Sequence, residues 1–576
     1  MKCTACGNEN AEGTRFCIYC GTPLTAPAPT PELAAPAVEE IKEEKVNLVL
    51  EEAPAADLQQ SSFRSEPAPA PVQPAVKPRP FRDGRGKYIV KRLIFFGCAL
   101  AIWILGVFLL KGAVPDGGYG WLPPDIFNRL LPTLILLLVP IIIAFIISMF
   151  VGLAKGAKAK SVIRIISAVL RAMVPFSLSL MLIYLLAFKA GWFPIMYMGS
   201  IETLILPVLT LTLPLTGYLM NAAVSNGRKP GFAGSIGAVA ACLADHMIII
   251  VIAEMAMEML FAVPGLCTMM IQMIYSYNFG PSFVAVGISL GVLVYLLKLL
   301  NDVIASLCAG GDPSDQVYGE RDKSDKAGKV LLLVGIIFAA VIVVAAIVLP
   351  LFAKESLTVV SSQNNLPAGA SGHILGTDTF GRDLFDVMAA ALRNTMIAGL
   401  VNTIVACIIG GIFGILTGFI RNWAAEIFKG FRYVFGYGAP LTIMILAVLL
   451  GVNSLLTTFV VVGMYCWGGI ADRVAGVIRA RKSHAYGRTA IALPILEQIV
   501  QTFCTSMIGV IVIGFLGLAR RSQAFPTFGQ LLSDLRSMIG RNDVFTISIF
   551  LVVTLMFTGF YLLHAGLSAK EKYTFK

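Results

Sequence analysis

The segment His373-Ile-Leu-Gly-Thr-Asp-Thr-Phe-Gly-Arg-Asp383 is followed by a long apolar run that ends at Phe419. The segment is polar and glycine-rich, whereas the run behind it is long enough to cross the hydrocarbon core of a bilayer. A glycine-rich turn before a core helix of a soluble domain is the alternative, and the length of the run disfavours it. The stretch therefore predicts a polar loop that leads into a membrane-spanning helix.

The composition of the whole chain is that of a membrane protein. Of its 576 residues, 57% are hydrophobic and only 14% are charged, which is too apolar for a soluble globule of this size. The formal net charge is +11, but most basic residues flank apolar runs on alternate sides, as membrane topology requires. We therefore expect membrane lipid, and no nucleic acid, as a partner.

Apolar runs predict about twelve transmembrane helices in two sets of six. The first set lies near residues 88–110, 130–153, 166–188, 202–224, 235–262 and 281–305, and the second near 330–353, 393–420, 433–451, 455–478, 494–518 and 545–566. The connections 154–165 and 225–234 are basic, whereas 112–128 contains no Lys or Arg. The positive-inside rule then places both chain ends in the cytoplasm, although the basic connection 519–544 is expected outside.

Two CxxC pairs stand at the start of the chain, formed by Cys3, Cys6, Cys17 and Cys20. Pairs at this spacing can close a tetrahedral zinc site, and so short a segment has almost no core to hold it without metal. Two redox-active pairs are the alternative, but no βαβ pattern surrounds them. The prediction is a zinc ribbon with a structural or docking role, because four thiolates leave no coordination position for a substrate.

Composition divides the chain into five parts. Residues 25–80 are rich in Ala, Pro, Glu and Ser without hydrophobic periodicity, which predicts a disordered linker. The predicted parts are the ribbon at 1–24, this linker, a first helical half at 81–311, a charged linker at 312–329 and a second helical half at 330–576.

The opening segment closely resembles a signature of the inner-membrane permeases of peptide- and nickel-class ABC importers. In the second of their two permease subunits, a His-x-Leu-Gly-Thr-Asp-x-x-Gly-Arg-Asp segment precedes the second membrane span. The matching residues are His373, Gly376, Thr377, Asp378, Gly381, Arg382 and Asp383. We expect the Arg and Asp side chains to fix this outer loop through charge-assisted hydrogen bonds.

The first half resembles the partner subunit of the same family, whose late signature is Glu-x-x-Phe-x-x-Pro-Gly-Leu. The matching residues are Glu258, Phe261, Pro264 and Gly265, followed by Leu266. The resemblance covers about residues 88–570 and implies two tandem all-α permease domains (MetI-like) fused in one plasma-membrane protein. It also implies uptake of peptides or a related small solute, with ABC ATPase subunits and an extracellular substrate-binding protein as partners.

Four ionisable residues on one predicted span are candidates for a translocation path: Asp245, His246, Glu254 and Glu258. Ionisable side chains are costly inside a membrane, tend to face the interior of a helix bundle, and there often mark a substrate path. The alternative places Asp245 and His246 near one membrane interface and Glu258 near the opposite one.

A cytoplasmic loop is the candidate for coupling to an ATPase. Family members carry a long loop with a Glu-Ala-Ala segment, but the corresponding stretch here, 471–493, is shortened. Its basic residues, which could meet an acidic docking groove, are Arg473, Arg479, Arg481, Lys482 and Arg488. The alternative is that they serve membrane topology alone.

The chain has no GxxxxGK[ST] loop, so ATP is expected only through partner subunits, and we predict that the chain is not an enzyme by itself. A second functional hypothesis remains open: a degenerate permease that acts as a membrane scaffold or regulator and recruits a partner through its zinc ribbon. The shortened loop favours the scaffold, and the retained motifs favour transport.

Overall fold

The computed structural model describes residues 84–569 with internal gaps. The gaps are residues 112–124, 155, 225–231, 277–280, 310–325, 354–356, 358–362, 421–465, 479–491, 518–521, 523 and 541. The predicted zinc ribbon and the linker at 25–80 lie outside the described residues, as do the predicted span at 433–451 and the first part, 455–465, of the one at 455–478.

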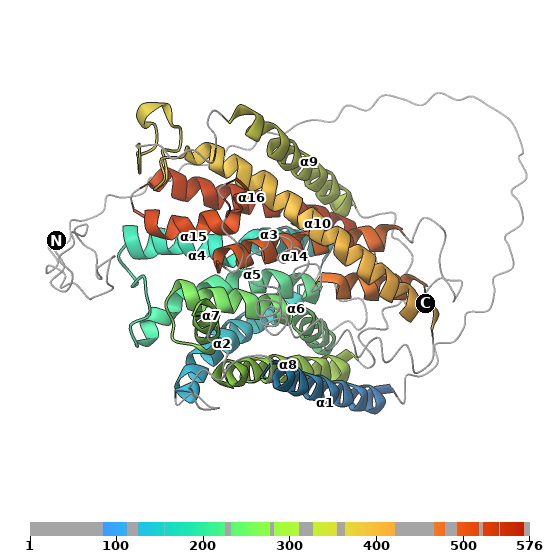
Figure 1. Ribbon diagram of the computed structural model, residues 1–576. Helices are drawn as coiled ribbons and strands as arrows, with labels where there is room; N and C mark the ends of the chain where they lie inside the picture. Colours follow the sequence, from blue (N-terminus) through green and yellow to red (C-terminus); the bar gives the residue numbers. More distant parts are fainter. Residues whose placement is uncertain are drawn as a thin grey trace, which may run out of the picture.

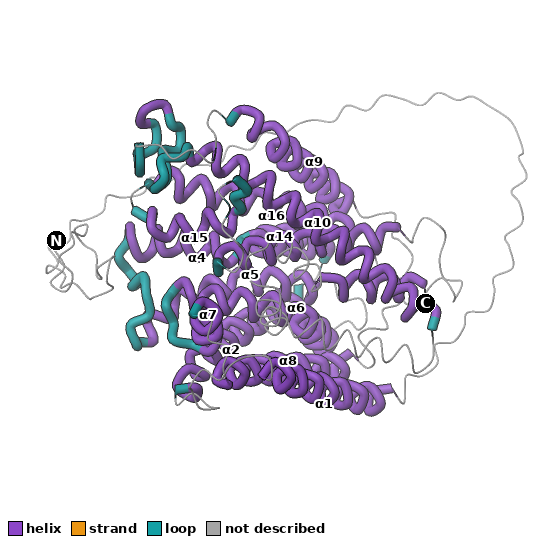
Figure 2. Tube along the Cα trace, in the orientation of Figure 1, coloured by secondary structure: helices purple, strands orange, loops and turns teal. Residues whose placement is uncertain are grey.

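The described residues form helices joined by loops (Figure 2). Those of the first half are α1 (Gly84–Lys111), α2 (Ile126–Gly152), α3 (Ala157–Ala172), α4 (Pro175–Leu182), η1 (Ile183–Lys189), η2 (Ile201–Leu204), α5 (Ile205–Val224), α6 (Phe232–Leu260), α7 (Leu266–Tyr275) and α8 (Pro281–Ala309). Those of the second half are α9 (Lys326–Val348), η3 (Leu349–Phe352), η4 (Ala370–Gly372), α10 (Leu384–Phe419), a helix at 466–478, α14 (Ala492–Phe515), α15 (Phe528–Met538) and α16 (Asp543–Ala569).

Seven of the described helices are long and apolar enough to cross a membrane, or up to nine elements if each of two bent helix pairs counts as one span. Long apolar helices satisfy their own backbone hydrogen bonds, which a membrane interior requires. The predicted class, an all-α polytopic membrane protein, is therefore confirmed. The total of twelve spans stays a prediction, because part of the second set lies outside the described residues.

The predicted span at 166–188 was wrong as a single helix. The structure breaks it into Ala159–Ala172 and Pro175–Lys189, which meet at an angle of 80°. Val174 has φ −59° and ψ 131°, an extended conformation, and Pro175 begins the second helix. A proline disfavours helical geometry in the residue before it, so the chain turns at this point. A second predicted span, 235–262, is bent by 60° within α6.

The start of the span predicted at 393–420 was also wrong. Helix α10 begins at Leu384, because Asp383 caps its N-terminus: the carboxylate accepts a hydrogen bond of 2.7 Å from the amide of Phe385. The helix therefore begins directly after the polar loop, before the apolar run that was predicted as the span.

The two halves pack side by side along several helices (Figure 1). Helix α16 contacts α9 of its own half and α3 of the first half, and α14 contacts α6. Figure 1 also shows α4, α7 and α15 toward the end of the molecule at which α10 begins. Large apolar side chains point away from the packed interior, as lipid contact requires; on α9 they include Leu333, Ile337, Val341, Val344 and Ile347.

Glycines allow close contact between helices of the second half. A Cβ atom added at Gly335 of α9 would lie 2.3 Å from the backbone of Leu563 on α16. Likewise, a Cβ at Gly414 of α10 would lie 2.7 Å from Val474. Small residues let membrane helices approach closely, so these glycines set the helix spacing.

Candidate functional site

A buried row of polar side chains crosses the interface between the two halves. The Nη1 atom of Arg171 on α3 lies 3.4 Å from Nδ1 of His564 on α16. His564 Nε2 lies 3.5 Å from Oε1 of Glu497 on α14, and Arg473 Nη2 lies 3.2 Å from Glu497 Oε2. The row thus joins α3 of the first half to the helix at 466–478 of the second.

The partners of His564 define which of its nitrogens carries the proton. A guanidinium group can only donate, so His564 Nδ1 accepts from Arg171. The imidazole is then neutral and carries its proton on Nε2, which faces the acceptor oxygen of Glu497. The cationic partner of the Glu497 carboxylate is therefore Arg473, whereas His564 faces it with a neutral N–H group.

Two tyrosines fix the orientation of the Arg171 guanidinium. Its Cζ lies 5.0 Å from the ring centroid of Tyr561 and 5.8 Å from that of Tyr218, within cation–π range. Arg171 Nε donates to the carbonyl of Ser167 at 3.3 Å. The Arg171 side chain is only 2% exposed, and its Nη2 has no hydrogen-bond partner among the described residues.

A small cavity lies against this arginine. Its volume is about 40 Å³, and its polar lining comes from Arg171, Tyr218 and His246. Apolar residues supply the rest, including three prolines: Pro140, Pro175 and Pro214. Pro140 and Pro214 lie inside α2 and α5, where each proline removes a backbone hydrogen bond from the helix beside the cavity.

Of the four residues predicted for a translocation path, only His246 lines this cavity. Its Nδ1 donates to the carbonyl of Cys242 at 2.8 Å. The side chain of Asp245 is 63% exposed and lies 3.8 Å from the Lys298 ammonium. Glu254 and Glu258 are fully buried elsewhere in the first half.

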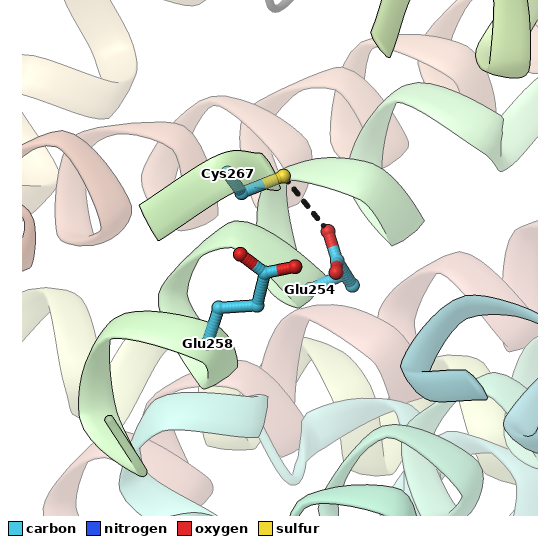
Figure 3. A group of neighbouring side chains, drawn as sticks. All are labelled: Glu254, Glu258 and Cys267. Carbon is cyan, nitrogen blue, oxygen red and sulfur yellow. Dashed lines mark hydrogen bonds between the residues drawn. The ribbon is translucent and has the colours of Figure 1, made fainter. Parts of the chain in front are cut away.

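Glu254 and Glu258 lie beside Cys267 (Figure 3). One oxygen of Glu258 accepts from the hydroxyl of Thr133, and the other accepts from the amide of Thr268 at 2.7 Å. The Cys267 thiol donates to Glu254 Oε2 at 3.1 Å. One ligand atom from each of the three residues lies within 4.8 Å of the others, a spacing that a metal ion could use. The hydrogen bonds already engage Glu258 and the thiol, so the group ties α6 to the first turn of α7.

This arrangement explains the late motif of the first half. A Cβ atom added at Gly265 would lie 1.9 Å from Oε1 of Glu258, so any larger residue would push the carboxylate out of its hydrogen bonds. The carbonyl of the buried residue Phe261 accepts from the amide of Tyr197 at 2.8 Å. Pro264 comes immediately before Gly265, in the short turn between α6 and α7. The motif thus forms a turn held by its own glutamate.

The polar loop before α10 is held by two acid–base pairs. Asp378 Oδ2 lies 2.6 Å from Arg382 Nη2, and Asp383 Oδ2 lies 2.8 Å from His373 Nδ1. The hydroxyl of Thr377 donates to the backbone carbonyl of residue 363 at 2.6 Å. The loop is thereby closed on itself at the start of the helix.

Two glycines of this loop have backbone angles that other residues rarely adopt. Gly376 has φ 82° and Gly381 has φ 76°. A Cβ at Gly376 would also lie 2.2 Å from the carbonyl of Leu366. The side-chain amide of Asn542 donates to the Leu375 carbonyl at 2.6 Å, which ties the loop to the start of α16.

Of the residues predicted for ATPase coupling, the structure describes only Arg473, which pairs with Glu497. The other four, and all four predicted zinc ligands, lie outside the described residues; they are Arg479, Arg481, Lys482, Arg488, Cys3, Cys6, Cys17 and Cys20.

Three members of the buried polar row were missed from the sequence: Arg171, Glu497 and His564. Each lies within a predicted membrane span, so the expense of an ionisable group inside a membrane is the signal that would have selected them. Their mutual contacts join positions that are far apart in the chain, and no local pattern shows them.

The fold and this site define a class: a polytopic helical membrane protein with a polar row between two helical halves and a small cavity beside that row, as expected of a permease. The chain is 25% identical to the dipeptide transport system permease protein DppC of Alkalihalophilus pseudofirmus over 250 residues, which are 39% of this chain and 82% of that protein. A zinc-ribbon domain model matches residues 2–24. These similarities confirm the predicted resemblance to a peptide-class ABC permease with an N-terminal zinc ribbon, and they indicate a transporter.

Proposed function

We propose that this chain is the membrane-spanning component of an ABC importer that takes up peptides or a related small solute, driven by separate ATPase subunits. The observation that carries the proposal is the similarity to DppC, a dipeptide transport permease. The second half also retains the loop motif and the first half the Glu258–Gly265 turn, each held by the contacts described above. An extracellular substrate-binding protein completes the proposed importer.

The proposed path for the solute runs between the halves. The cavity beside Arg171 is lined from α2, α3, α4, α5 and α6, and Ile508 of α14 adds one side chain from the second half. A route that opens and closes as two helical units move against each other fits alternating access.

The proposed coupling element is the connection that follows the helix at 466–478. Arg473 on this helix pairs with Glu497, and through it contacts His564 in the buried row. A movement of this connection would therefore be transmitted to the interface between the halves through the contacts of Arg473 with Glu497 and of Glu497 with His564. In this proposal residues 479–493 and both chain ends lie in the cytoplasm, and residues 479–493 meet the ATPase.

For the zinc ribbon we propose one structural zinc ion bound by Cys3, Cys6, Cys17 and Cys20. Metal analysis of the full chain purified without chelators should find one zinc per chain, and Cys3→Ser with Cys6→Ser should remove it. Deletion of residues 1–80 should leave transport intact. Loss of all function on this deletion would support recruitment of a partner by the ribbon in place of transport.

Coupling is tested by charge reversal in the predicted loop. The full chain is purified from its own host in nanodiscs, and the copurified ATPase subunits and their ATP hydrolysis are measured. The variant with Arg479, Arg481 and Lys482 changed to Glu should insert in the membrane but lose the ATPase. Absence of any ATPase from the wild-type preparation would contradict the proposed function and favour the scaffold.

A further inference from the structure

We propose that Arg171 binds the carboxylate group of the transported solute in the cavity that this side chain lines. This assignment rests on the proposed permease function and specifies its substrate class: solutes with one free carboxylate, such as a peptide with an unblocked C-terminus.

The first support is a buried positive charge without a counter-ion. Arg171 lies almost entirely inside the protein, and no described carboxylate lies within ion-pair distance of it. The acidic group of the same row, Glu497, is held by Arg473 and His564. A buried charge is costly unless it is paired, so an anion from outside the chain would be stabilised at this site.

The second support is the geometry of the free group. Arg171 Nε is engaged by the Ser167 carbonyl and Nη1 by His564, which leaves Nη2 without a described partner on a side chain that lines the cavity. The rings of Tyr218 and Tyr561 hold the guanidinium in place. Little side-chain entropy remains to be lost when an anion binds, so the site is preorganised.

The third support is the match between the cavity and a carboxylate. A single guanidinium carries one positive charge and donates best to the planar oxygens of a carboxylate. The volume of about 40 Å³ accommodates a few water-sized groups, and the lining beyond the polar residues is aliphatic, as at Leu136, Leu211 and Ile250. A doubly charged phosphate would bring a second negative charge into these apolar surroundings, so the site favours a group with a single negative charge, such as a carboxylate.

The experiment measures ligand-induced shifts of Tm for the purified full chain in nanodiscs, without a substrate-binding protein. The probes are alanyl-alanine, its C-terminal amide and sodium chloride, each at millimolar concentration. Alanyl-alanine should raise the Tm, whereas the amide and chloride should not. Equal shifts with the dipeptide and its amide would overturn the assignment, and so would an equal shift with chloride alone.

Three variants of α3 sharpen the test. Arg171→Gln should lose the dipeptide shift, while Lys160→Gln, which removes an exposed charge from the same helix, should keep it. Without ligand, Arg171→Gln should unfold no earlier than wild type, because it removes an uncompensated buried charge; a large loss of Tm would mean a structural role and overturn the proposal. Arg171→Lys retains the positive charge but lacks the paired N–H donors of the guanidinium, so it should show a smaller dipeptide-induced shift of Tm.

Failure of this inference is distinguishable from failure of the proposed function. ATP-driven uptake of the dipeptide and its amide alike, with no dipeptide shift, would reject the Arg171 assignment and leave the permease function in place. A carboxylate-specific shift in a chain without ATP-driven uptake would retain the binding site and reject the importer.

Discussion

The hydroxyl of Tyr218 on α5 is hydrogen-bonded to the hydroxyl of Tyr561 on α16, and this bond joins the two halves of the chain. The rings meet edge to face, with centroids 6.0 Å apart and an interplanar angle of 90°. Both side chains are buried, and both rings contact the Arg171 guanidinium. The interface between the halves is therefore polar at the point where the cavity lies.

Removal of one tyrosine hydroxyl should cost more than half of what the removal of both costs. Tyr218→Phe leaves the Tyr561 hydroxyl buried without its partner and should lower the free energy of unfolding by about 1–3 kcal/mol. The double variant with Tyr561→Phe leaves no buried hydroxyl without a partner, so its loss of unfolding free energy should be no larger than that of either single variant. A double-mutant cycle of denaturant unfolding in detergent measures this coupling, and additive costs would contradict the pairing.

The Glu258–Gly265 contact predicts a second coupled pair. Gly265→Ala places a methyl group against the Glu258 carboxylate and should lower the Tm clearly. In a Glu258→Ala background the same change should cost much less, because the clashing group is gone. Gly97→Ala on α1, where a Cβ meets nothing within 4 Å, is the matched control and should leave the Tm unchanged. An equal effect of Gly265→Ala in both backgrounds would contradict this geometry.

Neighbouring glycines on α10 should respond in opposite ways to the same substitution. Gly414→Leu drives a side chain into Val474 and should lower both folded yield and Tm. Gly411→Leu meets nothing within 4 Å and should leave both unchanged or slightly raised, since leucine has the higher helix propensity. Similar losses in both variants would mean that this face of α10 does not pack as described.

The orientation of the loop before α10 is testable by chemical labelling. Ser371 is exposed in that loop, and Ser371→Cys should react with a membrane-impermeant maleimide in intact cells. A cysteine at Glu320, in the linker predicted to be cytoplasmic, should react only after permeabilisation. The unmodified chain measures the background from native cysteines, and labelling of Ser371→Cys from the cytoplasmic side alone would reject the predicted topology.

Contacts within short segments were within reach of the sequence. Asp378 and Arg382 are four residues apart, and the expected charge-assisted bond between them is present. The turn at Gly265 likewise lies close to its glutamate in the chain. In both cases the chemistry and the spacing can be read together.

Contacts between the two halves could not be predicted from the sequence in this way. Arg171 and His564 are 393 positions apart, and only the packing of α3 against α16 brings them together. The bend before Pro175 had a visible signal, but an apolar run on both sides of it favoured one continuous span. Hydropathy measures how much of a segment is apolar and says nothing of the direction in which it continues.

Energised accumulation of a dipeptide is the most direct test of the proposed permease. Cells of the native host should concentrate radiolabelled alanyl-alanine above its level in the medium, and depletion of ATP should abolish the gradient. A strain without this chain, and one with the Arg479, Arg481 and Lys482 reversals, should reach only the external concentration. Equal, ATP-dependent accumulation with and without the chain would contradict its function as the permease.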